Sequence, residues 1–416
     1  MSEAAGSIAA PATSRAIRFR HVAPAGAPLR AADLARWAAG VAGGDPRARL
    51  STAVASRFGV TCRPVCTGRA GMTLLLAALS GRAGGARREV LIPSYTCYSV
   101  AASVMKAGLT PHLVDVDPAT LDVDLDALAA AMSDRVLAVV ATNLYGHPSD
   151  VRGIEAIAQP HGAAVVDDAA QAMGAARDGE LAGARGTVGL FSLDKGKNVS
   201  AIDGGLIVSR DPEVVAVIDG VLAALAAPGA RHVATDAAKA VAYFVLLRPW
   251  LYWLPASMPG LQLGTTPFTM DFPLEGYSRT LAALAVPALD RLDAFTAARR
   301  ANAARLLDGL ADAPGVRTLA PIAGAEPVFL RLPVLADSAA RRDRWLRRLN
   351  DAGIGATASY PACLADVPEV RAGAIGADAP LPGGREVAAR ILTLPTHPFV
   401  SSSDIARIVD LVGGRV

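Results

Sequence analysis

Two carboxylates and a lysine are the residues whose order along this chain says most about chemistry. Residues 165–171 read Val-Val-Asp-Asp-Ala-Ala-Gln, and Lys197 follows 29 positions after Asp168. Active-site groups of parallel sheets gather at the carboxyl ends of strands, so we expect the carboxylate and the amine to meet at one edge. A lysine that forms a Schiff base and a carboxylate that keeps a ring nitrogen protonated suit pyridoxal phosphate (PLP) chemistry. Taken alone, the segment fits an ordinary ion pair or a solvated strand end equally well.

A second segment is a candidate phosphate site. Residues 67–71, Thr-Gly-Arg-Ala-Gly, precede a predicted helix, whose first backbone N–H groups can bind an anion. A plain turn in front of a helix has the same pattern. The basic loop 194–198 does not match a nucleoside-triphosphate loop, because Phe191 stands where that motif needs glycine and Asn198 where it needs serine or threonine. No G-x-G-x-x-G follows a strand either, which argues against dinucleotide binding.

The elements around these residues alternate. From about residue 43 onward, short β-rich runs alternate with Ala/Leu-rich helical stretches, the pattern of a mostly parallel sheet with helices on both faces. The predicted strands are 90–93, 112–116, 137–142, 164–167, 187–192 and 205–209. The predicted helices are 71–79, 99–107, 124–132, 150–159 and 212–226. The first part of the chain is therefore predicted to be an α/β domain.

A smaller α+β domain is predicted to follow. It has one long helical pattern, then a strand-like run and two further helices, at residues 279–310, 328–335, 339–352 and 402–412. We divide the chain into a flexible leader (1–26), a large domain (27–275) and a small C-terminal domain (276–416). The leader lacks the uninterrupted apolar core of a secretory signal.

Composition excludes several classes of protein. With 52% hydrophobic and 19% charged residues, the chain is not of the disordered type. Its 41 basic and 38 acidic residues balance too closely for a nucleic-acid-binding surface. Four cysteines without a CxxC pair give no zinc motif and predict a reducing, cytoplasmic setting. The most apolar run, 240–247, is far shorter than the roughly 20 residues that span a bilayer.

Several motifs taken together resemble the DegT/DnrJ/StrS family of PLP-dependent sugar aminotransferases, which have the type I aminotransferase fold. These motifs are VLIPSYT at 90–96, VDVDPATL at 114–121, NLYGHPSD at 143–150, DDAAQA at 167–172, the segment 191–205 with its lysine and paired glycines, and LPTHP at 394–398. They occur in the family's order at close to its spacings, and the similarity runs from about residue 27 to the C-terminus. The resemblance implies a large, mostly parallel sheet domain followed by a smaller C-terminal α+β domain.

The resemblance also implies roles for individual residues. Lys197 matches the Schiff-base lysine, and Lys195 is a nearby rival that fits a surface lysine. Asp168 would pair with the pyridine nitrogen, and Gln171 would approach the ring near its phenolic oxygen. No metal is implied.

The implied phosphate ligands are Gly68, Arg69 and Ser192, although the family usually has serine or threonine where Arg69 stands. The aromatic residue that normally stacks on the cofactor ring is replaced by Cys97, so stacking either falls to Tyr98 or is absent.

Two further departures concern the substrate side. Ser278 stands nearest to the place of a family asparagine that reaches the partner subunit's phosphate, which puts the cross-subunit contact in doubt. The family's proline-leucine-histidine motif is replaced at residues 360–363 by Tyr-Pro-Ala-Cys, which removes a frequent histidine. His147 and His397 lie in family-like motifs, and we expect structural roles for both.

The aromatic segment 240–263 interrupts the family pattern. Its tryptophans and tyrosine, with a flanking arginine, would suit a membrane surface or a lipid-linked or otherwise bulky substrate. We favour packing on a second subunit or over the small domain.

The function implied by the resemblance is that of a homodimeric transaminase. It would move an amino group, with glutamate as donor, to a nucleotide-linked 4-keto-6-deoxy sugar in polysaccharide, glycolipid or secondary-metabolite biosynthesis. Two alternatives stay open: a PLP-dependent sugar dehydratase, against which Lys197 argues because that subgroup has histidine there, and a non-catalytic or regulatory member of the family.

Overall fold

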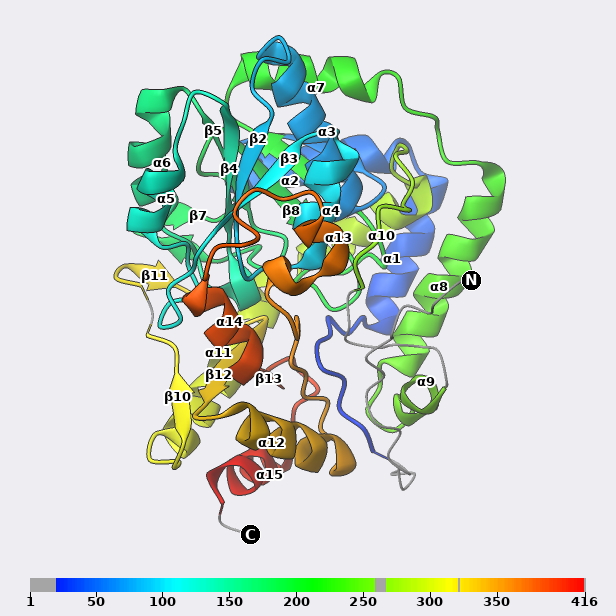
Figure 1. Ribbon diagram of the computed structural model, residues 1–416. Helices are drawn as coiled ribbons and strands as arrows, with labels where there is room; N and C mark the ends of the chain where they lie inside the picture. The colour runs from blue at the N-terminus through cyan, green and yellow to red at the C-terminus, as the bar shows by residue number, and fades with distance from the viewer. Residues whose placement is uncertain (1–19, 259–266, 321, 415–416) are drawn as a thin grey trace, which may run out of the picture.

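A seven-stranded sheet forms the centre of the computed structural model, which describes residues 20–258, 267–320 and 322–414 (Figure 1). The strands are β1 (Thr61–Val65), β2 (Glu89–Pro93), β3 (Thr110–Val114), β4 (Val136–Thr142), β5 (Ala164–Asp168), β8 (Val188–Ser192) and β9 (Gly205–Ser209). Their order is β1-β9-β8-β5-β4-β2-β3, and β9 runs opposite to the other six strands. The predicted α/β class and mostly parallel sheet are confirmed.

Helices cover both faces of this sheet because its central strands are apolar on both sides. Val166 of β5 belongs to a core cluster with α3 (Gly68–Arg82) and α4 (Tyr98–Lys106). Val165, the preceding residue, belongs to a different cluster with α5 (Leu125–Ala131) and α6 (Val151–Ala158). Successive side chains of a strand point to opposite faces, so the continuous apolar run predicts burial on both.

The six predicted strands correspond to β2, β3, β4, β5, β8 and β9. The prediction omitted β1 and the first two helices, α1 (Ala31–Ala42) and α2 (Pro46–Phe58). β1 is a five-residue edge strand that contains Pro64, a residue that argues against a strand unless the strand lies at an edge. Its pairing with β9 is a tertiary contact that local sequence does not reveal.

The long helix predicted for residues 279–310 is wrong, because the chain forms α10 (Arg279–Leu289) and α11 (Leu292–Leu310) instead. Leu284 of α10 packs in the core cluster that also includes α2 and β1. Leu306 of α11 packs in a separate cluster beneath a second sheet. The break between the two helices lets one apolar pattern serve two different cores.

The second sheet has three strands, β10 (Val316–Thr318), β12 (Arg331–Ala336) and β13 (Ile391–Pro395), and lies below the large sheet in Figure 1. Around it lie α12 (Ala339–Asp351), α14 (Pro382–Arg390) and α15 (Ser402–Gly413). The remaining short elements are β6 (Ala176–Arg177), β7 (Glu180–Leu181), β11 (Ala325–Glu326), α7 (Pro212–Leu222), α13 (Pro368–Arg371), η1 (Leu144–Gly146), η2 (Gln159–His161) and η3 (Leu364–Asp366). The division into domains at residue 275 stays a prediction.

Residues 20–26 are anchored rather than loose. Val22 donates its N–H to the Gly353 carbonyl at 2.8 Å and accepts the N–H of Gly355 at 2.8 Å. The carbonyl of Ala23 lies 2.8 Å from Nε2 of the buried His397. Residues 1–19 of the predicted leader lie outside the described residues.

The aromatic segment 240–263 contains the last residues of α8 (Ala230–Leu246) and all of α9 (Trp253–Ser257), and its residues 259–263 lie outside the described part. Its inner side is packed, since the Tyr243 hydroxyl accepts the N–H of Ala27 at 3.1 Å. Its outer side is open, with Trp250 62% exposed. No helix in the described ranges is long and apolar enough to cross a bilayer.

A pair of glycine substitutions tests the packing behind the site. In Gly189→Ala of β8, the new Cβ would lie against the backbone carbonyl oxygen of Gly183, so a strand or loop must move. We expect a loss of about 3 kcal/mol in the free energy of unfolding. Gly220→Ala in α7 is the control: its Cβ would meet no atom within 4 Å, and we expect a gain of up to about 1 kcal/mol. Urea unfolding measures both, and equal effects would contradict this packing.

Candidate active site

The carboxyl ends of β4, β5 and β8 form one wall of a cavity of about 480 Å³. Strand register places Thr142 and Leu190 on either side of Asp168, and all three residues line the cavity. Lys197 enters from the loop after β8, and Gly68 comes from the start of α3. Residues far apart in sequence therefore meet at one sheet edge, as the sequence predicted.

Asp167 and Asp168 have different environments. The Asp167 carboxylate is fully buried and accepts hydrogen bonds from Asn143 Nδ2 at 2.8 Å and from the N–H of Gly183 at 2.7 Å. It also pairs with the Arg185 guanidinium at 3.3 Å, and that side chain is itself buried. Since its lone pairs are occupied within the protein, Asp167 is a structural residue.

Asp168 faces the cavity. Its Oδ1 accepts one hydrogen bond, from the N–H of Ala170 at 3.0 Å. Burial raises the pKa of this carboxyl to about 6, against the opposing effects of the Ala170 N–H and the positive charge of Lys197. A carboxylate that is costly to keep charged is a strong acceptor for a cationic N–H.

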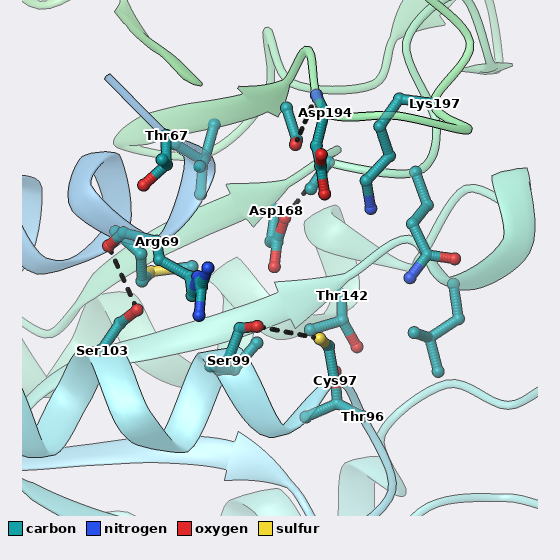
Figure 2. Close-up of a pocket in the computed structure, with 18 of the residues that line it drawn as sticks. Thr67, Arg69, Thr96, Cys97, Ser99, Ser103, Thr142, Asp168, Asp194 and Lys197 are labelled. Atoms are coloured by element: carbon teal, nitrogen blue, oxygen red, sulfur yellow. Dashed lines mark hydrogen bonds between the residues drawn. The ribbon is translucent and has the colours of Figure 1, made fainter. Parts of the chain in front are cut away.

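The Lys197 side chain extends from its loop toward Asp168 (Figure 2). Its amine and the Asp168 carboxylate both face the cavity. Within the described ranges its amine has no hydrogen-bond or ion-pair partner. Lys195 differs: it is exposed, donates to the Ile202 carbonyl at 3.4 Å and lies 3.6 Å from Asp194. Of the two lysines, only Lys197 lines the cavity beside Asp168, and its role as the Schiff-base lysine stays a prediction.

The predicted phosphate site lies at the N-terminus of α3. Thr67 caps the helix by accepting the N–H of Ala70 at 3.0 Å, which leaves the N–H groups of Gly68 and Arg69 without an intrahelical acceptor. A Cβ on Gly68 would lie 3.3 Å from the Ser192 hydroxyl, so glycine lets the helix end approach β8. Such a helix end attracts anions.

Arg69 lines the same cavity. Its guanidinium lies over the Phe272 ring, 5.2 Å from the ring centre. This contact holds the side chain at the cavity wall. The structure therefore places Arg69 beside the helix N-terminus, and its contact with a phosphate stays a prediction.

Gln171 is held from both ends. Its Oε1 accepts the N–H of Tyr145 at 3.0 Å, and its Nε2 donates to the Tyr360 hydroxyl at 2.9 Å. These bonds fix the amide at the cavity wall, and its approach to the phenolic oxygen of the cofactor ring stays a prediction.

Tyr98 does not lie where the stacking role requires it. It is the first residue of α4, and its hydroxyl accepts the N–H of Ala362 at 2.9 Å, which turns the ring toward Tyr360. Cys97, and not Tyr98, lines the cavity. Among the described residues, Tyr360 is the aromatic side chain that lines it, from the segment that replaces the family's histidine motif.

Ser278 and the two histidines lie outside the cavity. Ser278 is the buried N-cap residue of α10. Burial lowers the pKa of both His147 and His397 to about 4, so both rings are neutral at pH 7. His147 packs edge-on against Phe329, and His397 bonds to the Ala23 carbonyl, which agrees with structural roles.

Three polar residues of the cavity were not predicted as site residues from the sequence: Thr96, Thr142 and Asn143. The buried hydroxyls of Thr96 and Thr142 have no hydrogen-bond partner in the described part of the chain, and both residues line the cavity. Asn143, which also lines it, bonds to both Asp167 and the Asp168 carbonyl. Since Thr142 ends β4 as Asp168 ends β5, the strand end carried a signal for Thr142 and for Asn143, which follows it. Thr96 lies three residues after the end of β2, where the strand pattern gives no such signal.

These residues fit PLP. A helix N-terminus and the Ser192 hydroxyl suit its phosphate, and Asp168 suits a protonated ring nitrogen. Lys197 offers a free amine for its aldehyde. The unpartnered hydroxyls of Thr96 and Thr142 are further donors for a bound polar group.

The fold and this site define an aminotransferase with the type I fold. The model of the DegT/DnrJ/EryC1/StrS aminotransferase family matches residues 41–413. The chain therefore belongs to this family of PLP-dependent aminotransferases, and the resemblance drawn from the motifs is confirmed.

Individual relatives are similar to this chain over different lengths. A dTDP-3-amino-3,4,6-trideoxy-alpha-D-glucose transaminase from Streptomyces venezuelae is 30% identical over 349 residues, which cover 82% of this chain and 80% of that protein. A UDP-N-acetyl-3-dehydro-alpha-D-glucosamine 3-aminotransferase from Acidithiobacillus ferrooxidans is 37% identical over 172 residues, which cover 41% of this chain and only 46% of that protein. The solved structure of the sugar aminotransferase CalS13 from Micromonospora echinospora superposes with a TM-score of 0.74 at 25% identity, covering 96% of this chain and 100% of that one.

Asp168→Asn tests the electrostatic cost of this site in protein without cofactor. The folded pKa of about 6 exceeds the ordinary 3.8, so the folded state holds its proton more tightly and stability falls as pH rises through this window. Removing the carboxylate should therefore stabilise the protein by about 3 kcal/mol at pH 8 and by about half as much at pH 5.

The Asn oxygen still accepts the Ala170 N–H, so the comparison isolates the charge. Urea unfolding of both proteins at the two pH values gives the difference. A stabilisation independent of pH would show that the carboxylate is not destabilised by burial.

Proposed function

We propose that this chain binds PLP at the cavity and transfers an amino group from glutamate to a nucleotide-linked keto-sugar. The observation that carries the proposal is the pair formed by Asp168 and Lys197, a buried carboxylate and an unpartnered amine at one cavity that also contains a helix N-terminus. When bound, PLP supplies an aldehyde that exchanges amines and a ring that accepts electrons from the substrate carbon.

Asp168 would hold the proton on the ring nitrogen. Its burial makes the isolated carboxylate costly, and a cationic N–H partner removes that cost. The Asp167 carboxylate cannot take this role, because its bonds to Asn143, Gly183 and Arg185 occupy it.

Lys197 would bind the cofactor and then move the proton. Once a donor amine has taken its place, its free Nζ would be the base that takes the proton from the substrate carbon and later returns it. The absence of a competing salt bridge keeps this amine available, within the part of the chain that the structure describes.

The substrate classes are inferred from relatives. The two relatives described above are named for amino transfer on dTDP- and UDP-linked sugars, which supports a nucleotide-linked keto-sugar as acceptor. Glutamate as donor, the 4-keto-6-deoxy form of the sugar and a homodimeric state come from the family resemblance. All four cysteines are free, which supports a cytoplasmic setting. Membrane-surface contact through 240–263 stays a prediction.

The test follows the visible absorption of protein mixed with PLP, before and after glutamate is added. Wild-type protein should become yellow, because Lys197 binds the aldehyde of the cofactor, and it should bleach with glutamate, because amino transfer leaves an amine in place of that aldehyde. Lys197→Ala should bind PLP without the lysine-bound colour and lose at least about 1,000-fold in turnover, since base and attachment point are lost together.

Lys195→Ala is the matched control and should keep both colour and bleaching. Loss of colour in Lys195→Ala alone would reassign the reactive lysine. If the wild-type protein becomes yellow and no amino acid bleaches it, the transferase proposal is contradicted. Analysis of the product formed from a keto-sugar then distinguishes amino transfer from elimination of water.

A further inference from the structure

Two departures from the family pattern meet in the cavity. Cys97, which stands where the resemblance implies a stacking aromatic residue, lines it, and so does Tyr360, from the segment that replaces the histidine motif. They are far apart in sequence, since Cys97 directly precedes α4 and Tyr360 lies between α12 and η3. Among the described residues, Tyr360 is the aromatic side chain that lines this cavity. The cavity therefore has an aromatic ring, but a different part of the chain supplies it.

The Cys97 thiol and the Tyr360 hydroxyl are neighbours. The thiol lies along the first turn of α4 and donates to Ser99 Oγ at 3.2 Å (Figure 2). Burial raises the pKa of the Tyr360 hydroxyl well above its ordinary value of 10, and the nearby Cys97 thiol acts in the same direction. Tyr360 is therefore neutral at pH 7. Because the two side chains adjoin, a large ring at position 97 would have to share the space that Tyr360 occupies.

The backbone on both sides of Tyr360 is constrained. Ser359 has a φ of 55°, in the left-handed region that residues other than glycine enter at an energetic cost. Its buried hydroxyl lies 3.3 Å from that of Thr393 on β13. Pro361 follows and favours extended backbone at Tyr360. Since such strain persists only where the surroundings enforce it, the fold itself directs Tyr360 toward the cavity.

Three side chains hold the Tyr360 ring. Its hydroxyl accepts a hydrogen bond from Nε2 of Gln171 at 2.9 Å. The rings of Tyr95 and Tyr98 pack against it, with centroids 5.9 and 5.8 Å away. Neither of these two rings lines the cavity, so they support the one that does. A ring that is already immobile loses little entropy when a ligand packs on it.

We propose that Tyr360 is the aromatic side chain that packs against the PLP ring, and that the small side chain of Cys97 leaves it the room. This inference rests on the proposed function, since it assumes that the cavity binds PLP. The phosphate, ring nitrogen, aldehyde and phenolic oxygen of PLP already have candidate partners here, which leaves its flat ring to be contacted. A protonated pyridine ring is a flat cation, which an aromatic side chain attracts through dispersion and through the charge.

The experiment measures binding of pyridoxamine phosphate to the full chain freed of cofactor, by calorimetric titration. This probe has an amine in place of the aldehyde, so it forms no bond to Lys197 and its affinity reports the non-covalent contacts alone. Tyr360→Leu should weaken binding about 5- to 30-fold, the range expected for a lost aromatic contact with a cationic ring. Tyr360→Phe keeps the ring and should stay within about threefold of the wild type.

A second substitution tests whether the two positions share one space. In otherwise wild-type protein, Cys97→Phe adds a ring that competes with Tyr360, so we expect no gain in affinity. In Tyr360→Leu the space is free, and adding Cys97→Phe should restore the affinity to within about threefold of the wild type. Such non-additivity is expected only of positions that adjoin. A general loss of packing in Tyr360→Leu would not be restored in this way.

Tyr252→Leu is the matched control. Tyr252 lines an adjoining cavity of about 570 Å³ and not the first one, so its loss should change the affinity less than about threefold. Urea unfolding of each variant establishes that it is folded before the titration.

Three results would overturn the inference. Equal effects of Tyr360→Leu and Tyr252→Leu would reduce it to a general packing effect. Equal losses in Tyr360→Phe and Tyr360→Leu would show that the hydroxyl bonded to Gln171 matters and the ring does not. A folded double variant that binds no better than Tyr360→Leu would show that the two positions do not share one space. If wild-type protein binds neither PLP nor pyridoxamine phosphate, the proposed function itself fails, which is a distinguishable outcome.

Discussion

The buried ion pair between Asp167 and Arg185 determines how the site is built. Both side chains lie out of solvent, so removing either would leave an uncompensated buried charge, which is among the costliest changes a protein can undergo. Asn143 bonds to both partners and ties the end of β4 to the end of β5. Because successive side chains of a strand point to opposite faces, holding Asp167 toward Arg185 turns Asp168 into the cavity.

Asp168 and Lys197 line the same cavity without forming a salt bridge within the described residues. Burial raises the pKa of the Asp168 carboxyl. The Lys197 amine opposite it has no hydrogen-bond or ion-pair partner in the described part of the chain. The apoprotein thus contains a carboxylate and an N-terminal helix end that each need an external partner. A ligand with a cationic ring N–H and an anionic phosphate satisfies both, which explains why such an unfavourable arrangement is compatible with a stable fold.

The sequence predicted the parts of this site that depend on local pattern. Apolar runs that end in polar residues located β5 and Asp168, the motif order located Lys197, and the glycine-containing turn before a predicted helix located the N-terminus of α3. Tyr98 could not be placed from sequence, because the direction of its ring is set by the backbone of Ala362, 264 residues away. The pairing of β1 with β9 and the break between α10 and α11 are likewise set by tertiary packing.

The central claim is that Lys197, and no other amine of the chain, reacts at this cavity. Borohydride reduction of the PLP-loaded protein, followed by digestion and mass spectrometry of the peptides, tests it most directly. We expect the reduced cofactor on the peptide that contains residues 191–205, with fragmentation placing it on Lys197. Modification at Lys195 or at another lysine, or no modified peptide at all, would contradict the account.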